Sequence, residues 1–270
     1  MRICTVLLIV LSSLSALAQV PAKTTQTIYW LFFELPPAVE FRASPPGYMV
    51  EIHRLLTAHM PEYKHQVVEV PFLRILQQMK KKMKVCSLMV LKNPERSKFI
   101  EFGTPLLQGY PAGVIARKDD PKILKYVVKP GLVDFDRILK DESLTLGLVA
   151  ERFYGKKINA SLAHKNEVKL VEKKSLNVDH ELKALLGLGR IDVYLGYPFE
   201  ADSDKFTFYF VKDGLEVLDP RVGCERSEFG KEVIAKTESL RKQHKLDEEF
   251  IKVYNRYYSL DAQKKYKSLQ

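Results

Sequence analysis

The sequence contains few cysteines and a single tryptophan. After residue 18 it has no hydrophobic run long enough to span a membrane. Three cysteines are too few for a small disulfide-framework protein, and the absence of a low-complexity tract excludes a collagen-like or disordered chain. The phosphate-binding pattern GxxxxGK[ST], the nucleophile pattern GxSxG and the metal-binding pattern HExxH are also absent. The sequence therefore predicts no catalytic residue, no metal site and no cofactor.

The first eighteen residues have the layout of a secretory signal peptide. A short positive start, Met1-Arg2, precedes the apolar stretch Ile3–Leu17, and Ala16-Leu17-Ala18 forms a small-x-small cleavage site. The stretch is shorter than a usual transmembrane helix and is diluted by serines, so we expect cleavage after Ala18 rather than a retained anchor. Residues 19–270 are then expected to be periplasmic. The formal net charge of +10 fits an anionic partner, but by itself it does not distinguish nucleic acid, a membrane surface or an acidic solute.

Hydrophobic patterning predicts two successive α/β units followed by a helical tail. We expect strands or extended segments at 27–33, 66–70, 85–91, 113–117, 144–149, 168–171, 192–195, 206–211 and 217–224. We expect helices from Gly47 to Met60, from Pro71 to the lysines at 80–82, and at 152–163, 179–188, 229–240 and 247–258. The fold class is α/β, with mixed sheets flanked by helices.

Several short motifs, taken in order, resemble one protein family. The segment VCSLMVLKNPERSKFIEFGTP (85–105) resembles the signature in which a buried strand leads to T-x-x-R, as in bacterial extracellular solute-binding proteins of family 3, the periplasmic amino-acid-binding type. Leu35-Pro36-Pro37 looks like the first pocket loop of that family, and 47–52 looks like its helix start. Gly189-Arg190-Ile191-Asp192-Val193 is similar to its G-R-x-D-A strand entry, and 224–234 resembles its closing strand and helix.

The resemblance implies a two-lobed periplasmic-binding-protein fold with two hinge crossings. Lobe I would comprise residues 19–107 and 216–270, and lobe II would comprise residues 108–215. The hinge crossings are expected near 105–117 and 206–215. Because the returning strand lies beside the third strand of lobe I in this family, Cys86 and Cys224 are expected to form a disulfide. The cysteines alone leave two separate buried thiols as the alternative.

The resemblance also places a ligand site in the cleft between the lobes. Arg96 matches the family arginine that binds a ligand carboxylate, a role suited to a planar guanidinium. Phe72 matches an aromatic residue that packs on the ligand, although ordinary core packing is an equal alternative. Further candidates near the cleft are Trp30, Glu34, Arg74, Lys92, Asn93, Arg152 and Tyr154. For Trp30 the alternative is a core position, and for Arg74 and Lys92 it is a solvated side chain.

The sequence departs from the family where the ligand's amino group would bind. Tyr197 stands in place of the family aspartate, so a zwitterionic amino acid would lose its carboxylate partner. Asp192 is expected to orient its strand instead. A carboxylate, another small polar solute or a short peptide therefore stays open, and the cluster of cationic candidates favours an anionic ligand.

Three functions are consistent with these residues. The leading prediction is a monomeric solute-binding protein that delivers a small ligand to an inner-membrane permease of the ABC type or to a receptor. An enzyme on the same fold, resembling a dehydratase, is an alternative, with Glu34 as its candidate acid or base. A basic module that binds envelope polymers is another, because of the lysines at 80–82 and 84. Nucleic acid is not an expected partner of an exported protein.

Overall fold

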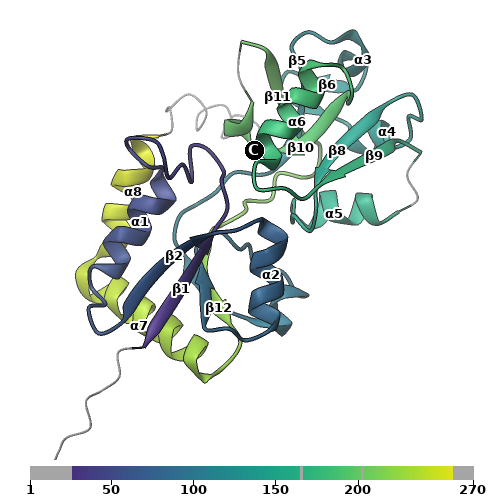
Figure 1. Cartoon of the computed structure of the whole chain (residues 1–270). Coiled ribbons are helices and arrows are strands. Elements are labelled where there is room, and N and C mark those ends of the chain that lie inside the picture. The colour runs from purple at the N-terminus through teal and green to yellow at the C-terminus, as the bar shows by residue number, and fades with distance from the viewer. Residues whose placement is uncertain (1–25, 165–166, 202–203, 258–270) are drawn as a thin grey trace, which may run out of the picture.

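The chain folds into two lobes joined by two crossing segments (Figure 1). The computed structural model describes residues 26–164, 167–201 and 204–257. The predicted signal peptide, residues 1–18, lies outside the described residues. Within the described ranges, no helix combines the length and the apolar character needed to cross a membrane.

Lobe I is built on a five-stranded sheet in the order β2-β1-β3-β12-β4. β1 runs parallel to both β2 and β3, and β12 runs antiparallel to β3 and β4. The strands are β1 (Thr27–Phe32), β2 (Lys64–Glu69), β3 (Val85–Ser87), β4 (Ile100–Pro105) and β12 (Arg221–Glu225). The helices are α1 (Tyr48–Thr57), α2 (Phe72–Lys80), α7 (Glu228–His244) and α8 (Leu246–Asn255), with a short 3-10 turn at Arg96–Lys98. The helical tail thus packs on lobe I, where α7 contacts β4 and β12 and α8 contacts α1.

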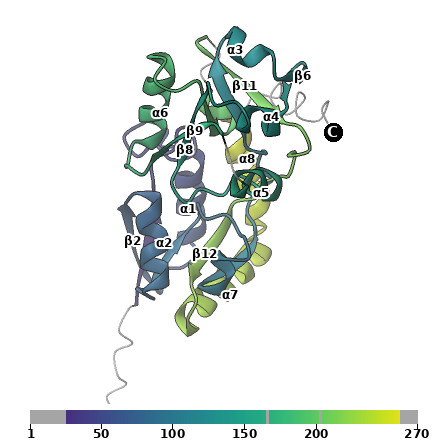
Figure 2. The same cartoon turned by 90° about the vertical axis from the view of Figure 1, so that its right-hand side faces the viewer.

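Lobe II is built on a seven-stranded sheet in the order β6-β7-β11-β5-β10-β8-β9. Its strands are β5 (Gly113–Arg117), β6 (Val127–Lys129), β7 (Leu132–Val133), β8 (Thr145–Val149), β9 (Lys169–Lys173), β10 (Val193–Gly196) and β11 (Phe206–Val211). Its helices are α3 (Pro121–Leu124), α4 (Phe135–Leu139), α5 (Lys156–Ala163) and α6 (Val178–Gly187), with a 3-10 turn at Pro198–Glu200. Figure 2 shows these helices gathered around the upper lobe. Asp192 accepts a hydrogen bond from the Thr145 amide at 2.9 Å, so it joins the start of β10 to β8 as its predicted orienting role requires.

Most predicted elements are present, and the differences have local causes. The helix expected at 152–163 begins only at Lys156, because Gly155 adopts a left-handed backbone (φ 98°) that a helix cannot continue through. The strand expected at 85–91 ends at Ser87. The predicted hinge ranges overlap the crossings without matching them. Because β5 and β11 are paired strands inside lobe II, the crossings are confined to 106–112 and 212–220, so the first range was too long and the second was placed too early in the chain. The division of the chain at 107/108 and 215/216 falls within these crossings and stays a proposal.

A disulfide joins Cys86 to Cys224, as expected. The two residues lie directly opposite each other on the antiparallel strands β3 and β12. Both are fully buried in the core of lobe I, beside residues such as Trp30 and Ile28. The disulfide therefore fastens the returning chain to the centre of the first sheet, across a separation of 138 residues.

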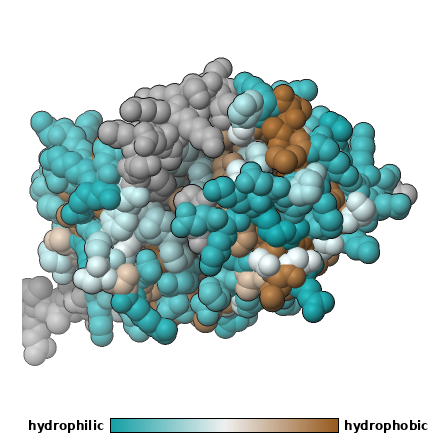
Figure 3. All heavy atoms as spheres, turned by 90° about the horizontal axis from the view of Figure 1, so that it is seen from above, coloured by the Kyte–Doolittle hydropathy of each residue, from teal (hydrophilic) through white to brown (hydrophobic). Residues whose placement is uncertain are grey.

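The face of the molecule seen in Figure 3 is largely polar. Hydrophilic residues cover most of the face in Figure 3, and hydrophobic residues appear there in small separate groups. A contiguous apolar lining is found instead in the cavity between the lobes.

Candidate ligand-binding cleft

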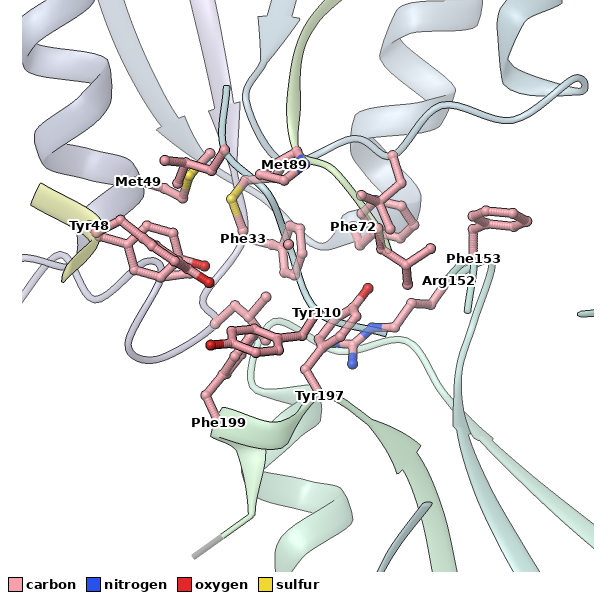
Figure 4. Close-up of a pocket in the computed structure, with 18 of the residues that line it drawn as sticks. Phe33, Tyr48, Met49, Phe72, Met89, Tyr110, Arg152, Phe153, Tyr197 and Phe199 are labelled. Carbon is pink, nitrogen blue, oxygen red and sulfur yellow. The ribbon is translucent and has the colours of Figure 1, made fainter. Parts of the chain in front are cut away.

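A cavity of about 720 Å³, including its solvent-open mouth, lies between the two lobes. Nineteen described residues line it, eight of them aromatic and only two of them charged. Its lining is mostly apolar with a few polar groups, which is the composition usual for small-molecule sites. Figure 4 shows side chains from both lobes converging on this space.

Arg96 is buried in the wall of the cavity and touches both lobes. Its Nη1 donates a hydrogen bond to the Leu91 carbonyl at 2.8 Å, and its Nη2 donates to the Glu151 carbonyl, in lobe II, at 2.6 Å. The guanidinium also lies 5.1 Å from the ring centre of Phe72. Burial lowers the pKa of Arg96 to about 10, so the group remains charged at neutral pH. Arg96 therefore holds the lobes together and places a positive charge in the cleft.

The 3-10 turn that carries Arg96 is shaped by a short polar residue. The Asn93 Oδ1 atom accepts a hydrogen bond from the Arg96 amide at 2.8 Å, and the Asn93 carbonyl accepts from Ser97 Oγ. Asparagine favours such turns because its side chain bonds to the backbone a few residues ahead. Asn93 thus orients the arginine rather than lining the main cavity.

Arg152, the second cation of the cavity wall, is paired with a buried carboxylate. Its Nη1 lies 2.9 Å from Glu200 Oε1 and 3.2 Å from Oε2, and both side chains are almost completely buried. Glu200 also accepts a hydrogen bond from the Tyr197 amide at 3.2 Å. Among the described residues, Nη2 of Arg152 is buried without a hydrogen-bond partner. A buried charged donor in this state is costly, so Arg152 can still take an acceptor.

A second carboxyl group influences this pair. Burial and the neighbouring Asp179 raise the pKa of Glu200 to about 7, while Arg152 acts in the opposite direction. Asp179 is itself buried, and its Oδ2 lies 2.8 Å from Lys183 Nζ. Two carboxyl groups side by side in a dry site cannot both ionise easily. The charge of the buried Glu200 carboxyl group therefore depends on pH near neutrality.

The remaining wall is aromatic and apolar. Tyr197 and Phe199 stack with ring centres 5.4 Å apart, and the Arg152 guanidinium lies 5.4 Å from the Tyr197 ring. At the other end of the cavity, the rings of Tyr48 and Tyr254 meet edge to face at 5.2 Å. In Figure 4, Phe33 and Tyr110 lie between these ends, and Tyr197 lies beside Arg152. The cavity is thus cationic at one end and aromatic along its length.

The structure brings four of the predicted site residues together. Phe72, Arg96, Arg152 and Tyr197 all line the cavity, although they come from different parts of the chain. Their roles in binding stay predictions, since they are defined here by position. Burial raises the pKa of Tyr197, with Arg152 opposing the effect, so its hydroxyl is neutral at physiological pH.

The other predicted residues do not line this cavity. Trp30 is fully buried in lobe I, where its Nε1 donates to His65 Nδ1 at 2.9 Å. Tyr154 is buried, and its hydroxyl accepts a hydrogen bond from the Val149 amide at 2.8 Å. Arg74 is exposed, and Glu34 is half-buried and outside the lining. Lys92 lines a separate hollow beside the crossing segments.

Several residues of the site were missed from the sequence. They are Phe33, Tyr110 and Phe199 in the walls, and Glu200 behind Arg152. Phe33 directly follows the end of β1, and Tyr110 lies within a predicted crossing. Both positions could have been recognised from the sequence. Glu200 had no such signal, because its partner lies 48 residues away.

Several solved structures have a similar fold. An arginine transport periplasmic binding protein of Legionella pneumophila superimposes with a TM-score of 0.65 at 13% identity, covering 87% of this chain and 100% of that one. A mutant of ArgBP from T. maritima gives 0.66 at 14% identity, covering 86% and 94%. An amino-acid ABC transporter substrate-binding protein, AbpA of Streptococcus pneumoniae, bound to L-arginine, gives 0.62 at 14% identity, covering 85% and 94%.

The chain has the two-lobed fold of the periplasmic amino-acid-binding proteins. The fold predicted from the sequence motifs is therefore confirmed. No family model and no curated protein matches the sequence, so the likeness rests on structure. At these identities the likeness concerns the fold, and the ligand has to be argued from this chain's own cleft. Among the described residues, no group of three or more His, Cys, Asp or Glu side chains is arranged to hold a metal ion.

Proposed function

We propose that this protein is a periplasmic solute-binding protein that captures a small carboxylate-bearing or otherwise anionic solute between its lobes. The observation that carries the proposal is the position of Arg96. Its guanidinium is buried at the seam and bonded to backbone of both lobes, and Arg96 lines the cavity between them. Because Arg96 contacts both lobes, binding of an anionic group beside it would be coupled to closure of the lobes. Delivery to an ABC-type permease or to a receptor, by a monomer, is the role that this fold supports.

The positive charge of the cleft favours an anionic ligand. Arg96 and Arg152 are the charged residues of the described lining, and Glu200 neutralises only one of them. The described lining contains no Asp or Glu that would partner an ammonium group. A buried charge without a partner is strongly unfavourable, so a ligand cation is disfavoured here. The proteins of similar fold include arginine-binding ones, and this chain's lining differs from what a cationic ligand needs.

The enzyme alternative gains no support from the geometry. Burial and the nearby Glu69 and Glu40 raise the pKa of Glu34, but the residue is outside the cavity lining. An acid or base must reach the reacting atoms to act. We therefore propose no catalytic function.

The proposal is tested by native mass spectrometry of the purified protein and by a thermal-shift screen with organic acids, amino acids and short peptides. A stabilising or co-purifying anion is expected, with its binding weakened in Arg96→Met. The matched control is Arg190→Met, since Arg190 is an exposed arginine of lobe II. If no solute in the screen stabilises the protein and none co-purifies, the proposed function is wrong.

A further inference from the structure

The cavity offers two different environments to one small ligand. One end contains the guanidinium groups of Arg96 and Arg152. The rest is ring faces and aliphatic side chains, in which Phe33, Tyr110 and Phe199 face the centre (Figure 4). A ligand that fills this space has one acidic group and a body that replaces water along the aromatic walls.

At the cationic end, one guanidinium nitrogen has no hydrogen-bond partner among the described residues. Nη2 of Arg152 is buried and has no partner among the described residues, while Nη1 is held by Glu200. The terminal nitrogens of Arg96 already donate to the Leu91 and Glu151 carbonyls. A carboxylate oxygen bonded to Arg152 would relieve its unpaired donor, and such charge-assisted bonds are the strong ones. The arginine with the unmet donor is therefore Arg152.

The described walls contain no charged side chain besides the two arginines. The other described lining residues are apolar or are tyrosines. An ammonium group on the ligand would lie near two guanidinium groups and would find no carboxylate in this lining. A second carboxylate would be buried against ring faces, which are negative at their centres.

We propose that the ligand is a monocarboxylate with an aromatic body and no charged amino group, and that Arg152 binds its carboxylate. This rests on the proposed function and specifies its ligand class. The stacked rings of Tyr197 and Phe199 form one wall for the ligand's ring. Arg96 acts beside it as the residue that fastens the lobes.

The test compares four ligands by isothermal titration calorimetry on the unmodified mature protein. 3-Phenylpropanoate, L-phenylalanine and 2-phenylethylamine share one ring and chain length but differ in charged groups, and succinate replaces the ring by a second carboxylate. We expect 3-phenylpropanoate to bind at least about tenfold more tightly than L-phenylalanine, with the amine and succinate weaker still. Tighter binding of L-phenylalanine, the amine or succinate overturns the proposal, while the proposed function stands. If none of the four binds at about 1 mM, the ligand class is also wrong.

Variants assign the carboxylate to one arginine. Arg152→Met should weaken 3-phenylpropanoate binding by about 10- to 100-fold. Arg190→Met, on the surface of the same lobe, should leave it unchanged. Because Arg152→Met leaves Glu200 unpaired, the double variant Arg152→Met/Glu200→Gln serves as the folded comparison, and it should lose the same affinity. Full affinity in the double variant overturns the role of Arg152.

Discussion

Replacing Arg152 by methionine should destabilise the protein in a way that depends strongly on pH. The variant leaves the Glu200 carboxyl group buried, without its cation and next to Asp179. An uncompensated buried charge of this kind costs about 3–5 kcal/mol. The cost applies only where Glu200 is ionised, since protonation removes the charge.

The pH window follows from the pKa of Glu200. In the unfolded chain the pKa of this carboxyl is near its ordinary value of 4.5, and in the folded protein its pKa is raised to about 7. Between these values the folded state holds a proton that the unfolded state has lost, so the free energy of unfolding falls as pH rises, by up to about 3 kcal/mol. Without Arg152 the pKa rises further, so the fall continues above about pH 7. The variant should therefore resemble the parent near about pH 5 and should be up to about 3 kcal/mol less stable near about pH 9, because each pH unit above about 7 contributes about 1.4 kcal/mol.

The measurement is urea unfolding without ligand, followed by circular dichroism at several pH values. Arg152→Met/Glu200→Gln, which removes both charges, should recover most of the stability lost at high pH. The control is Glu95→Gln, since the Lys98–Glu95 pair has side chains that are 70% and 68% exposed and should contribute little. Equal losses at low and high pH, or no recovery in the double variant, would refute the reasoning.

Three further predictions concern the lobes and their connections. Replacing Cys86 and Cys224 by alanine should lower the free energy of unfolding by about 2–5 kcal/mol, measured by urea unfolding, because the disulfide closes a loop with a separation of 138 residues; an unchanged value would contradict this. Arg96→Met removes the hydrogen bond to the lobe II backbone, so small-angle scattering without ligand should show a larger radius of gyration. A scattering curve identical to that of the parent would contradict the role of Arg96 in holding the lobes together. Gly109→Val should displace the crossing segments and lower the melting temperature, because a Cβ atom at Gly109 would lie 2.0 Å from the Leu218 carbonyl oxygen. An unchanged melting temperature would contradict this close approach.

Local sequence patterns were sufficient for the α/β class, whereas the two-lobed arrangement was predicted from the family resemblance. Apolar runs and their boundaries predicted most strands and helices, since alternation and helical periodicity reflect which face of each element is buried. The family resemblance predicted that Arg96 lies beside the cavity. It also predicted the Cys86–Cys224 disulfide. The helix predicted for Arg152–Ala163 was wrong at its start, because Gly155 precedes the helix and the helix begins at Lys156.

The chemistry of the cleft was decided by tertiary structure. Arg152 appeared in the sequence as a ligand contact, but only the folded chain brings Glu200 against it. Likewise, Trp30, expected at a strand end, and Tyr154, expected at a helix start, are buried in the cores of their lobes. Sequence periodicity reports which face of an element is buried, but it does not report which distant element buries it. The charge balance of a buried site depends on such distant partners, and so it emerges only when the two lobes have formed and met.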